Sequence, residues 1–182
     1  MNQPSVIFSH ASLYLRKITP EDADFLLKLN SRPEVMKYTG EEPWTSWHQA
    51  EVFIHENRIL SQKGVERWLV CEPDGTSVGM AGYRLFEDMP DQWDISFRFL
   101  PQYWNQGYAY ITVQLLTHHA LNVIMRPRLR AQVHEENTAS ARVLEKCGYY
   151  LDHFFDWGEM KWRCYYIRPE DFLALPEFQA VR

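Results

Sequence analysis

The spacing of hydrophobic and polar residues divides the first third of the chain into a strand and two helices. Residues 12–18, SLYLRKI, alternate between the two classes and predict a strand. In the following TPEDADFLLKLN, Thr19 can cap a helix and Pro20 suits its first turn. A second helix is expected to begin near Thr45 or Ser46 and to run through WHQAEVFIHENRIL. The N-terminal part is therefore predicted to place two helices after one strand.

The hydrophobic period then changes from that of a helix to that of a strand. Residues 66–72, 77–86 and 93–100 each predict a strand. The turn PDG at 73–75 joins the first two, since Pro presets φ and Gly supplies a positive φ. A polar loop is expected at 87–92. Together these segments predict an antiparallel meander of three strands.

The remaining segments alternate between helices and strands. They are a helix of about 15 residues after Gly107, a strand at 129–133, a short helix at 138–148, a hairpin turning near Gly158, and a final helical turn in RPEDFLAL. A helix between two strands favours one parallel crossover, here from 93–100 to 129–133. The pattern predicts an α+β fold with a mixed, mostly antiparallel sheet. No repeat or linker divides the chain, so one domain is expected over 1–182.

The composition argues against several classes of function. The 182 residues are 46% hydrophobic and 15% aromatic, enough for a sizeable core, and the net charge of −5 argues against nonspecific nucleic-acid binding. The three cysteines show no CxxC spacing, and the seven histidines form no metal-ligand pattern, so we expect no metal. Without an evident signal peptide or an apolar run of about 18 residues, the sequence predicts a cytoplasmic protein that does not enter membranes.

The stretch YWNQGYAYITVQ places Gly107 directly before a predicted helix. The first turn of a helix carries unpaired N–H groups and a partial positive charge, and a turn without bulky side chains lets a phosphate approach them. Neither GxxxxGK[ST] nor GxGxxG is present, so this is neither a P-loop nor a dinucleotide fingerprint. By itself the stretch is compatible with an anion site or with an ordinary turn.

The stretch NTASARVLEKCGYY places Asn137 and Ser140 three residues apart, on one face of a helix start. Capping of that helix by Asn137, with Ser140 packed beneath it, explains the pair equally well.

Taken together, the two stretches resemble the GNAT N-acetyltransferases, and within them the ribosomal-protein N-terminal (alanine/serine) acetyltransferases. LYLRKITPEDADFLLKL, PQYWNQGYA, NTASARVLEKCGYY, and YYI followed by PEDF match that family's segments in order. The resemblance covers nearly the whole chain. It implies a central sheet of about seven strands flanked by four helices, with two splayed central strands that hold acetyl-CoA.

The resemblance also assigns cofactor-binding residues. The strand end at Phe99 and Leu100 is expected to lie along the pantetheine arm and to offer a backbone N–H to the oxyanion. The pyrophosphate turn corresponds to Trp104, Asn105, Gln106, Gly107, Tyr108 and Ala109, and the residue that bonds the pantetheine amides corresponds to Asn137. Asn105 occupies a position that is commonly glycine, so the turn is expected to be stiffer or differently bent.

The catalytic residues implied by the resemblance are Ser140, Glu159 and Asp94. Ser140 matches a serine proposed to protonate the leaving thiolate. The tyrosine that many GNAT enzymes use as this acid is replaced here by Leu144. Gln132 stands where another branch has a catalytic glutamate, so Glu159 on the late hairpin is the first candidate for the base and Asp94 is the reserve. A surface carboxylate and a salt-bridge partner, respectively, explain these two acids as well.

The implied activity is direct acetyl transfer from acetyl-CoA to an amine, most readily the α-amine of a protein N-terminus. A small amine such as an amino acid, polyamine or drug is the alternative, and a catalytically silent acyl-CoA-binding module is another. The acceptor is expected at the loop between the first two helices, the 87–92 loop and the late hairpin. The expected partners are acetyl-CoA and the acceptor, with the protein a monomer or homodimer.

Overall fold

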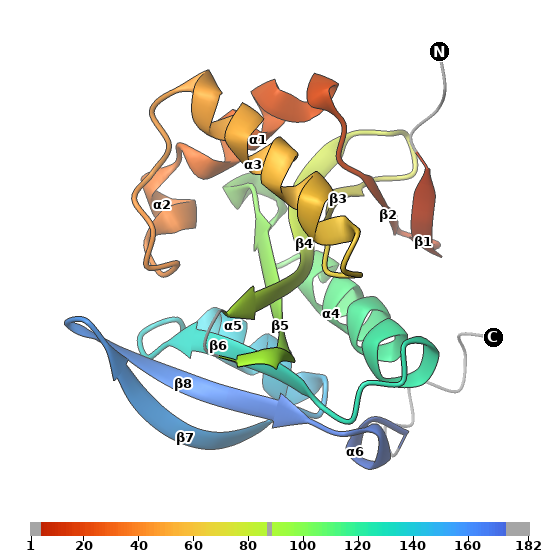
Figure 1. Ribbon diagram of the computed structural model, residues 1–182, viewed down its shortest axis with the longest axis vertical. Helices are drawn as coiled ribbons and strands as arrows, with labels where there is room; N and C mark the ends of the chain where they lie inside the picture. Colours follow the sequence, from red (N-terminus) through yellow and green to blue (C-terminus); the bar gives the residue numbers. More distant parts are fainter. Residues whose placement is uncertain (1–4, 87–88, 174–182) are drawn as a thin grey trace. The chain divides into compact units, whose positions relative to one another are not determined.

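The computed structural model describes residues 5–86 and 89–173. Within them an eight-stranded sheet has the strand order β1-β2-β3-β4-β5-β6-β8-β7 (Figure 1). The parallel pairing is between β5 and β6, with Asp94 opposite Arg130, whereas β1–β2, β2–β3, β3–β4, β6–β8 and β7–β8 are antiparallel. The predicted α+β class, mixed sheet and parallel crossover are therefore confirmed.

The strands are β1 (Val6–His10), β2 (Leu13–Lys17), β3 (Arg67–Cys71), β4 (Ser77–Phe86), β5 (Met89–Phe99), β6 (Leu129–His134), β7 (Tyr150–Trp157) and β8 (Met160–Ile167). The helices are α1 (Ala23–Asn30), α2 (Pro33–Met36), α3 (Trp47–Ser61), α4 (Tyr108–His118), α5 (Thr138–Lys146) and α6 (Pro169–Leu173). Short 3-10 turns cover Pro20–Asp22 and Pro101–Tyr103, and a π-helical turn covers His119–Val123.

The structure corrects three predictions. The sheet has eight strands rather than about seven, because residues 6–10 pair as β1 on the outer edge of β2. Six helices rather than four are formed by the described residues, since α2 and α6 are short turns that carry little periodicity. The loop predicted at 87–92 is wrong from Met89 onward, where β5 has already begun, and residues 87 and 88 lie outside the described residues.

The described residues divide into two compact units. The first contains residues 5–84 and 96–109, and the second contains 85–86, 89–95 and 110–173. Strand β5 and helix α4 each contribute residues to both units. That residues 1–182 act as a single domain stays a prediction.

The first unit has its core between the helices α1 and α3 and the strands β3 to β5. Helices α1 and α3 lie side by side (Figure 1). The buried core residues are Ala23, Leu26, Leu29, Ala50, Leu69, Cys71, Met80 and Leu100. Ser46 caps α3, and the side chain of Asn57 on α3 bonds the backbone N–H of Arg67 at 2.8 Å and its C=O at 3.0 Å. Helix α3 is therefore joined to the start of β3 by polar bonds as well as by burial.

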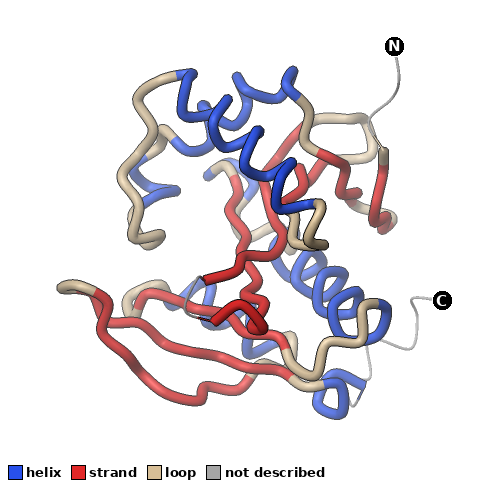
Figure 2. Tube along the Cα trace, in the orientation of Figure 1, coloured by secondary structure: helices blue, strands red, loops and turns tan. Residues whose placement is uncertain are grey.

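The second unit is built on β6, β8 and β7. Strands β7 and β8 form a long, curved hairpin (Figure 2). Helix α4 contributes Leu116, the π-helical turn after it contributes Ala120, and helix α5 contributes Leu144, each 0% exposed, to the buried residues of this unit. The hydroxyls of Thr117 and Tyr149 bond each other at 2.8 Å, and burial raises the pKa of Tyr149 well above its ordinary value. The segment NTASARVLEKCGYY, which contains the candidate residues Asn137 and Ser140, lies in this unit.

Strand β4 lies very close to the end of β5 at Gly79. A Cβ placed on Gly79 would lie 2.5 Å from the carbonyl oxygen of Arg98 and 2.5 Å from the ring of Phe99. Both contacts are far shorter than van der Waals distance, and one of them is to backbone that cannot rotate away. Glycine at this position is therefore required by space.

Replacing Gly79 with alanine should destabilise the protein by about 1–3 kcal/mol, because the added methyl group overpacks the junction of β4 and β5. Chemical denaturation followed by tryptophan fluorescence measures this free energy of unfolding. Ser77→Ala on the same strand is the matched control, and we expect less than about 0.5 kcal/mol for it. Equal midpoints for the two variants would contradict the close approach.

Candidate active site

The end of β5 directs its backbone groups to two different edges. The N–H of Leu100 donates to the C=O of Val78 on β4 at 3.0 Å. Successive residues of a strand point their N–H and C=O groups to opposite edges, so those of Phe99 point away from β4. The indole Nε1 of Trp104 donates to the C=O of Phe99 at 2.8 Å. Because the Leu100 N–H is already bonded to Val78, the Phe99 N–H is the better candidate of the two predicted residues for an oxyanion donor.

The predicted pyrophosphate turn follows this strand end. Asn105 has φ 59° and Gly107 has φ 86°, so both adopt the left-handed conformation. Among residues with a side chain, Asn is one of the few that tolerates this region, and glycine adopts it freely. The glycine that is common at position 105 in relatives is thus replaced by the residue that best preserves its backbone geometry. Gln106 fixes the turn further by donating from Nε2 to the C=O of Gln102 at 2.6 Å.

Helix α4 begins at Tyr108, immediately after this turn. The Tyr108 ring stacks on Phe99 with the ring centroids 6.4 Å apart, and its hydroxyl donates to the carboxylate of Glu72. That bond, together with partial burial, raises the pKa of Tyr108 to about 12. The phenol therefore stays protonated at neutral pH and holds the first residue of α4 against the end of β3.

The turn has the features that a diphosphate needs. A Cβ on Gly107 would have no neighbour within 4 Å, so the space beside the backbone is open. The start of α4 contributes unpaired N–H groups and the positive end of the helix dipole. Eight of the nine predicted cofactor residues lie in the first unit, namely Phe99, Leu100, Trp104, Asn105, Gln106, Gly107, Tyr108 and Ala109. The residues present fit the pyrophosphate of acetyl-CoA.

The ninth residue, Asn137, begins helix α5 in the second unit. Its Oδ1 accepts a hydrogen bond from the backbone N–H of Ser140 at 3.1 Å, so it caps the helix. Ser140 is half-buried, whereas Leu144, one turn later on the same face, is fully buried. Capping thus orients Asn137 and fixes the position of Ser140 relative to it.

Glu159 lies in the exposed turn of the β7–β8 hairpin. The C=O of Lys161, two residues later, accepts from the N–H of Glu135 at 2.9 Å. The hairpin turn and the segment leading to Ser140 are therefore at the same end of the β6–β8 ladder. An exposed carboxylate at this place can accept a proton and pass it to water.

Asp94, the reserve base, is buried in a different environment. Its carboxylate is 0% exposed and lies 3.3 Å from Nε of Arg130, whose side chain is 2% exposed. Removing one member of a buried ion pair is strongly destabilising, so this carboxylate contributes to the folded state through Arg130. The geometry therefore favours a structural role for Asp94.

The cysteines lie away from the candidate chemistry. Cys71, Cys147 and Cys164 are all buried as free thiols. Burial raises the pKa of Cys147 to about 12, so almost no thiolate forms at neutral pH. Across the described segments, no three His, Cys, Asp or Glu side chains are grouped as metal ligands. Likewise, none of the helices described is long and apolar enough to cross a bilayer.

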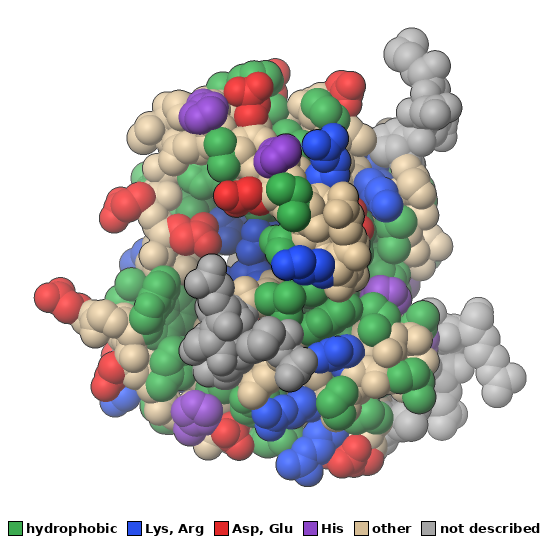
Figure 3. All heavy atoms as spheres, viewed as in Figure 1, with side chains coloured by type: hydrophobic (Ala, Val, Ile, Leu, Met, Phe, Trp, Pro, Cys, Tyr) green, Lys and Arg blue, Asp and Glu red, His purple; other side chains and the backbone are tan. Residues whose placement is uncertain are grey.

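A cavity of about 440 Å³ opens in the first unit beside the end of β5. It is lined by Glu41, Trp44, His48, Gln49, Val52, Phe53, Glu56, Arg67, Met80 and Arg98. Acidic and basic side chains are interspersed on the face of this unit drawn in Figure 3. The segment between α1 and α3, expected from the sequence to help form the acceptor site, contributes Glu41 and Trp44.

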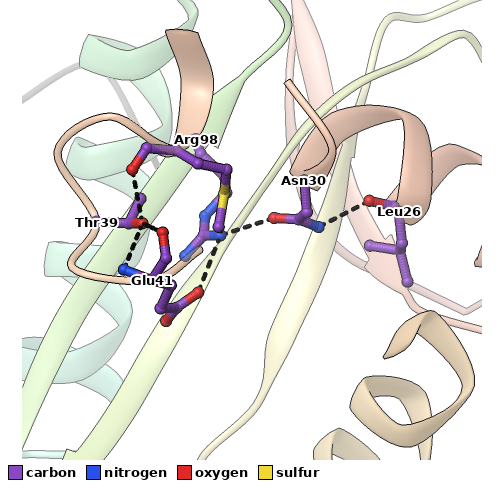
Figure 4. A network of polar contacts seen from close by, with 6 residues as sticks. Leu26, Asn30, Thr39, Glu41 and Arg98 are labelled. Carbon is purple, nitrogen blue, oxygen red and sulfur yellow. Dashed lines mark hydrogen bonds and ion pairs between the residues drawn. The ribbon is translucent and has the colours of Figure 1, made fainter. Parts of the chain in front are cut away.

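Arg98 connects the cavity to helices α1 and α2. Its Nη1 donates to Oδ1 of Asn30 at 2.7 Å, contacts Sδ of Met36 at 3.2 Å and lies 3.5 Å from Oε2 of Glu41 (Figure 4). Asn30 in turn donates to the C=O of Leu26 at 2.8 Å. This network spans α1, α2 and the following loop.

Sequence reasoning missed Arg98, Arg67 and Glu72. A signal was present for Arg98, since SFRFL places a charged residue inside a strand that is otherwise mostly apolar. Glu72 gave no such signal, because its partner Tyr108 lies 36 residues away in the chain.

The fold and the turn define a class of acetyl-CoA-dependent transferases, and comparison with known proteins identifies it. Residues 12–150 match the model of the acetyltransferase (GNAT) domain. N-acetyltransferase p20 of Bacillus licheniformis is 30% identical over 139 residues, which is 75% of this chain and 78% of that protein. The chain belongs to the GNAT acetyltransferase family. It is an N-acetyltransferase whose acetyl donor is acetyl-CoA.

Two solved structures share the fold at low identity. The spermidine N-acetyltransferase of Vibrio cholerae in complex with CoA and spermine is 18% identical, with a TM-score of 0.77, covering 90% of this chain and 99% of its own. The acetyltransferase of Salmonella typhimurium that modifies the N-terminal serine of ribosomal protein L7/L12 is 17% identical, with a TM-score of 0.78, covering 90% and 99%. The likeness extends to the whole fold and leaves the acceptor open.

Replacing Asn105 with valine should weaken acetyl-CoA binding, because a β-branched residue at φ 59° is strained by about 1–2 kcal/mol or more. We expect KM for acetyl-CoA to rise at least about 5-fold, since about 1 kcal/mol corresponds to this factor. Asn105→Gly, which keeps the geometry, should stay within about 2-fold of the parent. Calorimetric titration with CoA provides the direct measurement, and equal effects of valine and glycine would contradict this role of the backbone.

Replacing Asp94 with asparagine should destabilise the protein by about 3–5 kcal/mol, because it removes one charge of a buried ion pair with Arg130. The double variant Asp94→Leu/Arg130→Met should recover much of that loss. Thermal unfolding measures the loss of stability in the single variant and its recovery in the double variant. The folded fraction of Asp94→Asn is expected to keep kcat within about 3-fold and to show the parental pH profile. Loss of a pH-dependent limb would instead identify Asp94 as the general base.

Proposed function

We propose that the protein transfers the acetyl group of acetyl-CoA to the α-amine of a protein N-terminus. The observation that supports this proposal most is the cavity beside the end of β5, which is lined by aromatic side chains and by charged side chains of both signs. A peptide terminus presents an amine, backbone amides and varied side chains, and such a lining suits it. A linear polycation is better matched by a run of carboxylates without arginines.

The proposed chemistry follows from the residues described. The turn from Asn105 to Gly107 and the start of α4 hold the pyrophosphate of acetyl-CoA, which supplies an activated thioester carbonyl. Asn137 bonds the pantetheine arm. An uncharged acceptor amine attacks the carbonyl carbon while the Phe99 N–H stabilises the negative charge that develops on its oxygen. An α-amine, with a pKa near 7.7–8.0, supplies more of this uncharged form at neutral pH than a lysine does.

Two proton transfers complete the proposed reaction. The new C–N bond forms as the attacking nitrogen releases a proton to Glu159, directly or through water. The C–S bond then breaks, and the thiolate takes a proton from Ser140, which is replaced from solvent. Each such group contributes about 10²–10⁴-fold when it is positioned correctly. No covalent intermediate on the enzyme is needed, in agreement with the buried and protonated Cys147.

A polyamine is the second candidate acceptor. The relative from Vibrio cholerae described above carries spermine in its structure, and the carboxylates Glu41 and Glu56 lie in the cavity of this chain. A module that binds acyl-CoA without turnover is the third candidate. We further propose that the protein acts in the cytoplasm as one domain over residues 1–182, as a monomer or homodimer, and binds neither nucleic acid nor membranes.

Thiol release with a panel of acceptors tests the proposal. Acetyl-CoA is supplied with peptides that begin in Ser or Ala, with spermidine and spermine, and with free amino acids. We expect saturable release with peptides at a kcat/KM at least about 10-fold above that of the polyamines, and mass spectrometry should locate the acetyl group on the α-amine. A higher kcat/KM for a polyamine would overturn the proposal. Binding of CoA without release for any acceptor would favour the silent module.

Two variants accompany this panel. Ser140→Ala should lower kcat by more than about 10-fold if Ser140 is the acid. Gly107→Glu should abolish CoA binding, because it places a charged side chain against the diphosphate. Arg58→Gln, an exposed substitution on α3, is the control for both and should behave as the parent.

A further inference from the structure

The residue before helix α4 cannot cap it in the usual way. Gly107 has no side chain, whereas Ser, Thr, Asp or Asn at this position would bond the first N–H groups of the helix. The side chain of Gln106 is directed backwards, to the C=O of Gln102. Gly107 therefore leaves the N–H groups at the start of α4 to a ligand, and other contacts must hold the helix start in place.

Tyr108, the first residue of α4, supplies such contacts through its side chain. Between ring centroids it lies 6.4 Å from Phe99, in a stacked arrangement, and 5.9 Å from Tyr103, edge to face. Burial of aromatic surface depends little on direction, whereas a hydrogen bond depends strongly on it. The bond from the Tyr108 hydroxyl to the carboxylate of Glu72 is therefore the contact that fixes the far end of the ring.

The backbone of Glu72 is fixed by the turn that joins β3 to β4. Its N–H donates to the C=O of Thr76 at 2.9 Å, and its C=O accepts from the N–H of Gly75 at 2.9 Å. The side chain of Asp74 adds a third bond, accepting from the N–H of Thr76 at 2.9 Å. Glu72 thus presents its carboxylate from a well-bonded turn.

The bond between Tyr108 and Glu72 is of a strong kind. Both residues are half-buried, and a carboxylate acceptor makes a stronger hydrogen bond than a neutral one does. The bond and partial burial raise the pKa of Tyr108 to about 12, so the hydroxyl keeps the proton that it donates.

Electrostatics alone would give Glu72 the opposite effect on cofactor binding. A carboxylate near a diphosphate repels it, because both groups are negatively charged. Glu72 is joined by one hydrogen bond to the first residue of α4, so its charge by itself would weaken binding there. Any gain in affinity from Glu72 must therefore come through the position of Tyr108.

We propose that Glu72 is a positioning residue for acetyl-CoA, which acts through Tyr108 to hold the start of α4 in the orientation that binds the diphosphate. A helix start that already has this orientation loses little conformational freedom when the cofactor binds, and such preorganisation increases affinity. This inference rests on the proposed function, because it requires the diphosphate to lie at residues 105–108.

Calorimetric titration with CoA tests the proposal. Glu72→Ala should raise Kd for CoA about 10-fold, with a stoichiometry close to that of the parent. Stoichiometry counts the folded molecules, and Kd describes their affinity, so a purely structural role would lower the stoichiometry and leave Kd unchanged. Pantetheine lacks the diphosphate, so its Kd, measured by competition with CoA, should rise by less than about 2-fold.

Two matched variants separate the hydrogen bond from the charge. Glu72→Gln keeps an oxygen acceptor for the Tyr108 hydroxyl and should bind CoA within about 3-fold of the parent. Asp74→Asn removes a carboxylate from the same turn but keeps an acceptor for the N–H of Thr76, so Kd should stay within about 2-fold or fall. If Glu72 acted by charge alone, Glu72→Ala would bind CoA more tightly than the parent.

A double-mutant cycle shows whether Glu72 acts through Tyr108. Tyr108→Phe removes the same hydrogen bond and should raise Kd for CoA by a similar factor. The double variant Glu72→Ala/Tyr108→Phe should then bind CoA no more weakly than either single variant. Additive losses in the double variant would overturn the inference.

The variant Gly107→Glu distinguishes this inference from the proposed function. If that variant fails to bind CoA while Glu72→Ala binds it with parental or higher affinity, only this inference is overturned. Equal losses of affinity for CoA and for pantetheine in Glu72→Ala overturn it as well. If Gly107→Glu binds CoA as the parent does, the diphosphate does not lie at this turn, and the inference and the proposed cofactor site are both wrong.

Discussion

The contact between Gly79 and the end of β5 is the constraint on which the candidate site depends. Because Gly79 has no side chain, β4 can lie close to the end of β5, where Val78 accepts the N–H of Leu100. That bond directs the N–H of Leu100 toward β4, and neighbouring residues of a strand direct their N–H groups to opposite edges. The N–H of Phe99 then points to the edge away from β4, where it can serve a reaction rather than the sheet.

The same strand end supplies two different functions on its two faces. The ring of Phe99 packs on Tyr108 at the start of α4, beside the turn that suits a diphosphate. The side chain of Arg98 points to the other face and bonds Asn30 on α1. Consecutive residues of one strand thus contact the candidate diphosphate turn and the cavity. Positioning of this kind is what a direct transfer between two bound molecules requires.

The sequence predicted most of the fold because its periodicities were long and its turn residues specific. The strand Ser77–Phe86 and the helix that follows Gly107 appear where expected, since each has a clear pattern and a defined boundary. The β1 strand VIFSH was missed because five residues are too few for a clear period, and the start of β5 at Met89 was missed because EDMPDQ at 87–92 is rich in polar residues. Residues carried by a motif could be proposed as site residues from the sequence, whereas Arg98 could not, because its contacts with Asn30 and Glu41 arise only in the folded chain.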